Sequence, residues 1–135
     1  MKRKLWLCLP PFLFALLDAG LTLFGQPDPY WRGDYSSPLE LNPAGFWLLH
    51  RHPLAFVAGV VCWAVCFSAV ILRLRPRPAF WFALFLTLGH GVGVASWLIR
   101  LGPAGYALAV LFLIAAERLA RFCWRPFLAP HTPPN

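Results

Sequence analysis

The sequence predicts an all-α polytopic membrane protein with four transmembrane helices, and three observations support this fold class. Hydrophobic residues make up 59% of the 135-residue chain and charged residues only 13%, a balance that a soluble domain of this size cannot bury in one core. The apolar residues form long runs separated by short groups of Lys and Arg. Trp and Tyr gather at the ends of these runs, where amphipathic rings favour the membrane interface. The spans are expected at about residues 5–25, 53–72, 79–99 and 102–120, within a single domain of residues 1–135.

The first span begins in the manner of a signal peptide, with a basic N-terminus before an apolar run. Asp18 interrupts that run, however, and no small-residue cleavage motif follows at the usual distance. We therefore expect a retained helix. Pro10 and Pro11 are expected either to start this helix or to kink it.

Residues 25–42 form the one long polar segment, and their content of Pro, Gly, Ser and Asp predicts an outer loop. Asn42 and Pro43 then have the pattern of an N-cap followed by proline at the first helical position. They predict a short interfacial helix at about 43–51, with a break at His52 because Pro53 disfavours helical geometry there.

The second span, residues 53–72, carries no charged residue over a length sufficient to cross a bilayer. The third span contains His90 among three glycines, and the fourth ends near Glu117 and Arg118. Glu117 and Arg121 have the i, i+4 spacing of a helix-surface ion pair. The proline-rich residues 126–135 are expected to form a disordered tail.

The distribution of Lys and Arg predicts that both termini are cytoplasmic. One side receives nine basic residues from the N-terminus, the 73–77 turn and the C-terminus, whereas Arg32, Arg51 and Arg100 lie on the other. The expected location is the inner membrane of a bacterium. Because the basic residues form no dense patch, a nucleic-acid partner is excluded; the expected partners are the lipid bilayer and a membrane protein or a second copy of the chain.

Asp18 and Thr22 are the first candidate site residues. Asp18 lies roughly 9 Å below the outer end of its helix, where a carboxylate must be paired, protonated or hydrated. Thr22 lies one turn away on the same face. These residues could line a site for a ligand, an ion or a proton, or they could form an interhelical hydrogen bond that fixes packing.

His90 is the second candidate and lies about 15 Å below the outer end of the third span. Its difference in depth from Asp18 predicts a water-bridged contact, unless a tilt or kink allows a direct one. The alternative is a buried histidine bonded to a backbone carbonyl or to Thr87. Gly89 and Gly93 form a small-residue face that lets another helix approach closely.

Polar residues outside the spans form the third candidate group: Glu40, His50, Arg51 and His52. Histidines and carboxylates are zinc ligands, so His50, His52, His90 and Asp18 are weak candidates for a metal site. His50 and His52 are two residues apart, however, and point to different sides of a helix, which favours solvated polar residues and no cofactor. Arg51 could reach inward to neutralise Asp18 or could meet lipid head groups.

The segment Leu16–Leu23 contains Asp18 and Thr22, and Glu40-Leu41-Asn42-Pro43 follows after a loop. Over about residues 12–60 this pattern, Asp-x-x-x-Thr followed by Glu-x-Asn-Pro, resembles a family of small prokaryotic membrane domains of unknown function. That family has no established activity. The resemblance implies only that Asp18, Thr22, Glu40 and Asn42 belong to one structural unit.

Three functions remain open at this point. The favoured hypothesis is a non-enzymatic scaffold or accessory subunit that binds a partner or a lipid. The second is an intramembrane metal-dependent hydrolase that uses Asp18, His90 and the outer histidines. The third is a small oligomeric transporter or proton-coupled subunit that uses Asp18 and His90.

Overall fold

The computed structural model describes residues 2–128, and every regular element in this range is a helix. The elements are α1 (Lys2–Phe24), α2 (Asp28–Trp31), α3 (Pro43–Arg51), α4 (Pro53–Arg73), α5 (Pro76–Leu98), the 3₁₀-helix η1 (Ile99–Leu101) and α6 (Pro103–Leu128). Of these, three helical stretches are long and apolar enough to cross a membrane: Lys4–Phe24, Pro53–Arg73 and Pro76–Leu101. The all-helical prediction is therefore confirmed, and three of the four predicted spans fall on helices that could cross a membrane; α6 is not among the three.

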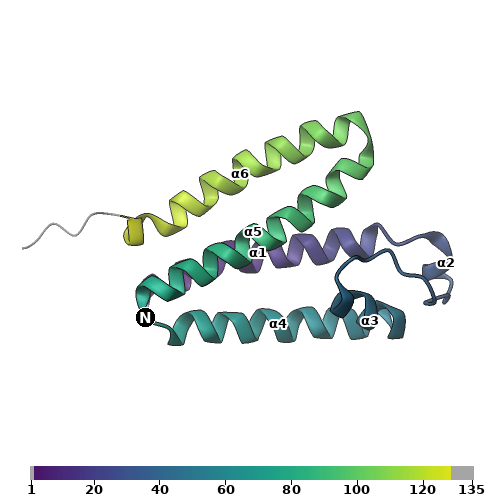
Figure 1. Ribbon diagram of the computed structural model, residues 1–135, viewed down its shortest axis with the longest axis horizontal. Helices are drawn as coiled ribbons and strands as arrows, with labels where there is room; N and C mark the ends of the chain where they lie inside the picture. The colour runs from purple at the N-terminus through teal and green to yellow at the C-terminus, as the bar shows by residue number, and fades with distance from the viewer. Residues whose placement is uncertain (1, 129–135) are drawn as a thin grey trace, which may run out of the picture.

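The long helices form an up-and-down bundle in which α4 and α6 lie on opposite sides of α1 and α5 (Figure 1). Helix α1 contacts α4, α5 and α6. The start of α1, the turn between α4 and α5, and the C-terminal end of α6 share one end of the bundle, which we call the N-terminal end. Helices α2 and α3 and the turn at η1 lie at the opposite end, which we call the loop end.

The two ends of the bundle are packed differently. Buried apolar side chains fill the N-terminal end, among them Leu7, Phe67, Ile71, Ala83 and Trp124. At the loop end a smaller cluster of Tyr30, Leu49 and Phe56 joins the 25–42 segment and α3 to α4. The space between these two clusters holds the polar residues described below.

Helix α3 begins and ends where the sequence predicts. The Asn42 side chain accepts hydrogen bonds from the backbone N–H groups of Ala44 (3.0 Å) and Gly45 (3.4 Å), with Pro43 in the first turn. His52 is extended (φ −177°, ψ 144°), so the chain breaks there. Its Nδ1 then accepts a hydrogen bond from the Leu54 N–H and caps α4.

Helix α1 runs through Pro10 and Pro11 without a break, so neither proline starts the helix. Two backbone donors are lost at these positions. The turns before them are held in place by Lys4, whose Nζ donates to the carbonyl oxygens of Leu72 (3.0 Å) and Leu74 (2.7 Å). This contact also provides partners for carbonyls at the C-terminal end of α4.

Helix α6 extends beyond the predicted end of the fourth span. Cys123 and Trp124 are buried against the N-terminal end of the bundle, and Phe127 packs beside them. Burial of these side chains favours continued helix, so residues 126–128, predicted as part of a disordered tail, are helical. Residues 129–135 of that tail lie outside the described residues.

Candidate functional site

A cavity of about 640 Å³ lies between α1, α4 and α5 toward the loop end, and residues 40–42 and α3 complete its wall. Its size is within the range of sites that hold small organic ligands. Most of its wall is apolar. Asp18, Thr22, Glu40 and Asn42, which the sequence resemblance groups together, all line it, as does His90.

Three helices each contribute one side chain to a hydrogen-bonded chain in this cavity. His90 Nδ1 of α5 lies 3.0 Å from Asp18 Oδ2 of α1, and the Trp63 indole N–H of α4 donates to His90 Nε2 at 3.4 Å. An indole nitrogen can only donate, so Nε2 must be an acceptor. With Nε2 as the acceptor, the ring proton lies on Nδ1, which donates to the Asp18 carboxylate.

The difference in depth between Asp18 and His90 predicts a water-bridged contact. The structure instead shows a direct one. Gly93 explains the close approach, because a Cβ at this position would lie 2.6 Å from the Asp18 Cγ. The absence of a side chain lets α1 and α5 come together here. Helix α5 is also inclined to α1 (Figure 1).

The sequence predicts that another helix approaches α5 closely at Gly89 and Gly93, but no helix does so at Gly89. A Cβ added at Gly89 would meet no atom within 4 Å, whereas one at Gly91 would lie 3.7 Å from a Phe14 ring carbon of α1. Gly89 lines the cavity, because no helix approaches α5 closely at this level. Contacts with α1 are thus made at Gly91 and Gly93.

Further polar groups line the cavity wall. Glu40 Oε1 accepts the Asn42 backbone N–H at 2.7 Å, and the Ser96 hydroxyl donates to the Gly93 carbonyl at 2.7 Å. The Arg100 guanidinium lies over the Trp97 ring, 4.1 Å from its centroid. Such stacking stabilises the cation without neutralising its charge.

The segment that carries Glu40 is fixed to the bundle by two buried polar side chains. The Tyr30 hydroxyl donates to the Leu49 carbonyl (3.1 Å), and burial, with a smaller effect from Tyr35, raises the pKa of Tyr30 so that it stays a donor at neutral pH. The Gln26 amide donates to the carbonyls of Thr22 (2.8 Å) and Leu39 (3.1 Å) and accepts the Leu39 N–H (2.9 Å). These bonds hold residues 40–42 against the cavity.

The structure does not bring the other predicted polar residues to this site. The Arg51 guanidinium lies over Trp47, the His50 ring stacks on Phe46, and His52 caps α4 beside Tyr35. None of these three lines the cavity, because each is held by a neighbour in α3 or the adjoining turns. Arg51 therefore does not neutralise Asp18. Within residues 2–128 no group of three or more His, Cys, Asp or Glu side chains could hold a metal ion, so the predicted ligand set is not assembled.

Sequence reasoning missed Trp63, Ser96 and Arg100. One sequence feature could have marked Trp63 as a site residue, because this tryptophan falls in the middle of a predicted span and not at its end. An indole N–H in hydrocarbon needs a hydrogen-bond partner. Arg100 falls in a predicted turn, where its charge suggests only topology. Arg100 lies beside the cavity because of the direction that the chain takes after the end of α5, and the sequence does not show this direction.

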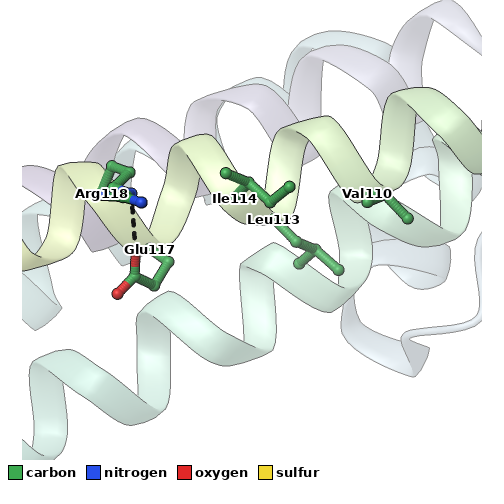
Figure 2. A pocket seen from close by; sticks show the side chains of 5 residues that line it. All are labelled: Val110, Leu113, Ile114, Glu117 and Arg118. Carbon is green, nitrogen blue, oxygen red and sulfur yellow. Dashed lines mark ion pairs between the residues drawn. The ribbon is translucent and has the colours of Figure 1, made fainter.

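A second, shallower hollow lies on α6 and is lined by Val110, Leu113, Ile114, Glu117 and Arg118 (Figure 2). Its polar side chains pair with one another, since Glu117 Oε2 lies 3.7 Å from Arg118 Nε and the other carboxylate oxygen contacts Arg121. The predicted Glu117–Arg121 pair is thus present. None of the candidate site residues lies there, and the cavity between α1, α4 and α5 is the candidate functional site.

Comparison with known proteins adds no support to this assignment, which rests on the sequence and structure of this chain. No protein-family model, no curated protein and no solved structure matches the sequence. The resemblance to a family of small prokaryotic membrane domains stays a prediction.

Proposed function

We propose that this chain is a small, non-enzymatic membrane protein that binds an amphipathic molecule in the cavity between α1, α4 and α5. The observation that carries the proposal is a mostly apolar cavity with a hydrogen-bonded Asp18–His90–Trp63 chain on its wall. An apolar pocket with a few fixed polar groups is the usual form of a small-molecule site. Such a binding subunit would act as a scaffold or accessory protein for a membrane partner.

The state of His90 supports binding and not catalysis. A histidine that acts as a general base needs a free ring nitrogen facing the reacting proton. Here Nδ1 is bonded to Asp18 and Nε2 accepts the Trp63 N–H. Both nitrogens already have partners, so the pair serves to hold the cavity wall and to present a carboxylate.

The position of the cavity supports an amphipathic ligand that arrives from the bilayer. The cavity wall between α4 and α5 includes Trp63 and Val92, whose exposed fractions are 47% and 67%. If α4 and α5 cross the membrane, these exposed side chains face hydrocarbon. The ligand can then enter sideways, with its apolar part still in lipid.

We also propose that α6 is the fourth crossing and that both ends of the chain are cytoplasmic. The nine-to-three distribution of Lys and Arg favours this orientation. The first residues of α1 and the last turns of α6 share one end of the bundle, as an even number of crossings requires (Figure 1). The proposed membrane is the inner membrane of a bacterium.

Cysteine labelling in intact cells tests this topology. In a background with the four native cysteines replaced by alanine, Ser36→Cys is expected to react with a membrane-impermeant maleimide. Arg75→Cys is expected to react only after the membrane is permeabilised, since the 73–77 turn is left on the side where insertion begins. Labelling of Arg75→Cys in intact cells would contradict the orientation.

Filling the cavity tests the proposed binding. Position 89 lines the cavity in open space, so Gly89→Phe is expected to occupy it without a clash. Gly20→Phe is the matched control, because a Cβ at Gly20 also meets no atom within 4 Å but Gly20 does not line the cavity. Native mass spectrometry from lipid nanodiscs should show a retained amphiphile on wild type and Gly20→Phe that is lost from Gly89→Phe. Equal retention by all three proteins would contradict a ligand in this cavity.

A further inference from the structure

We infer that the ligand of this cavity is an amphipathic organic cation, with an ammonium group held near Asp18 and Glu40 and an alkyl part against the apolar wall. The inference rests on the proposed function, since it names the chemical class that the same cavity accepts. It follows from the charge of the lining, from the Thr22 hydroxyl open to the cavity and from the apolar wall.

The cavity lining carries an uncompensated negative charge. Asp18 and Glu40 contribute two carboxylates, and Arg100 contributes one guanidinium. His90 Nε2 accepts the Trp63 N–H and so carries no proton of its own in this arrangement. Among residues 2–128 no ion pair joins Arg100 to Asp18 or to Glu40. A carboxylate in surroundings of low dielectric is stabilised by a bound cation.

Thr22 adds a polar group that a ligand of this cavity can contact. Its side chain is 3% exposed, lines the cavity and lies one helical turn from Asp18. In the described part of the chain its hydroxyl makes no hydrogen bond, in contrast to Thr87, whose hydroxyl donates to the Ala83 carbonyl at 2.7 Å. Trp124 Nε1 is the one fully buried side-chain polar atom without a partner in residues 2–128, so the Thr22 oxygen is open to the cavity and can bond a ligand there. The Thr22 oxygen can accept an N–H or contact the polarised methyl groups of a quaternary ammonium.

The apolar part of the wall selects an organic cation over a hydrated metal ion. Leu48, Phe56 and Val60 line the cavity together with the alanines of α1. A metal ion that lost its water here would find no group of three His, Cys, Asp or Glu side chains within residues 2–128, and burial of a bare charge is costly. An alkyl chain, by contrast, gains from burial against these side chains.

A ligand series of constant chain length tests the sign of the charge. Decyltrimethylammonium, decyl glucoside and decanoate would be dialysed against the full-length protein in nanodiscs of neutral lipid. Partition into the bilayer is subtracted by parallel dialysis against Gly89→Phe, in which the cavity is filled. We expect the ammonium compound to bind about tenfold more tightly than the glucoside, and decanoate to bind more weakly than either.

Charge-removing variants test which carboxylates are responsible. Asp18→Asn keeps an oxygen that accepts the His90 Nδ1–H, so its melting temperature should stay near that of wild type. We expect it to lower the affinity for decyltrimethylammonium about tenfold while leaving decyl glucoside binding unchanged. Glu40→Gln should act in the same direction. Asp28→Asn, which removes a carboxylate outside the cavity, is the matched control and should have no effect.

The outcomes separate this inference from the proposed function. Equal binding of the three compounds, or tighter binding of decanoate, would overturn the cation assignment and leave an amphiphile site in place. Equal uptake of all three by wild type and Gly89→Phe would overturn both. Loss of ammonium binding in Asp28→Asn as well would show attraction to the protein surface and would also overturn the inference.

Discussion

Replacement of Phe67 by alanine is expected to lower the free energy of unfolding by about 3–5 kcal/mol. The Phe67 side chain is 1% exposed and lies within the packed N-terminal end of the bundle. Its ring also packs edge-on against Trp63, with centroids 5.8 Å apart. Truncation therefore leaves a cavity that its neighbours cannot fill and removes support from the cavity residue Trp63. Unfolding in mixed micelles with increasing dodecyl sulfate, followed by circular dichroism, measures the loss.

Phe85→Ala is the matched control for this prediction. The Phe85 side chain, on α5, is 70% exposed, so in a bilayer its truncation would remove contacts with lipid and not with protein. The same truncation there is expected to change stability by less than about 0.5 kcal/mol. A large loss at Phe85, or equal losses at both positions, would show that the inside and outside of the bundle are assigned incorrectly.

Gly93→Ala is expected to lower the free energy of unfolding by about 1–3 kcal/mol, as overpacking does in other close-packed sites. The added methyl group would overlap the Asp18 carboxylate, which makes the hydrogen bond to His90. Either Asp18 leaves His90 or α1 and α5 move apart. The Asp18–His90 contact can be followed by the ¹⁵N chemical shifts of the His90 ring in labelled protein, and these should change together with stability.

Gly89→Ala, one helical turn away on the same helix, provides the comparison. Its new methyl group would enter open space, and alanine is the better helix former. Stability should therefore stay unchanged or rise by about 1 kcal/mol at most, with unchanged His90 shifts. If Gly89→Ala were the more harmful substitution, the close approach of α1 and α5 would have to lie at Gly89 and not at Gly93.

The sequence by itself determined the four long helices and α3, in their order, whereas α2 within the predicted loop and the 3₁₀-helix η1 were not predicted. Long apolar runs, the Asn42–Pro43 start signal and the break before Pro53 are local features, and local chemistry suffices to place helix ends. The continuation of α1 through Pro10 and Pro11, and of α6 to Leu128, depended instead on distant contacts made by Lys4 and Trp124. No pattern within either helix contains that information.

The sequence also singled out Asp18, Thr22, Glu40 and His90, since polar residues within or beside apolar runs are costly without partners. Only the tertiary structure decided which partners they have. Gly93 allows the close approach that brings His90 to Asp18, and the turn at η1 brings Arg100, not Arg51, to the cavity. Helix periodicity fixes which side chains share a face, whereas crossing angles and close approaches depend on the packing of several helices at once.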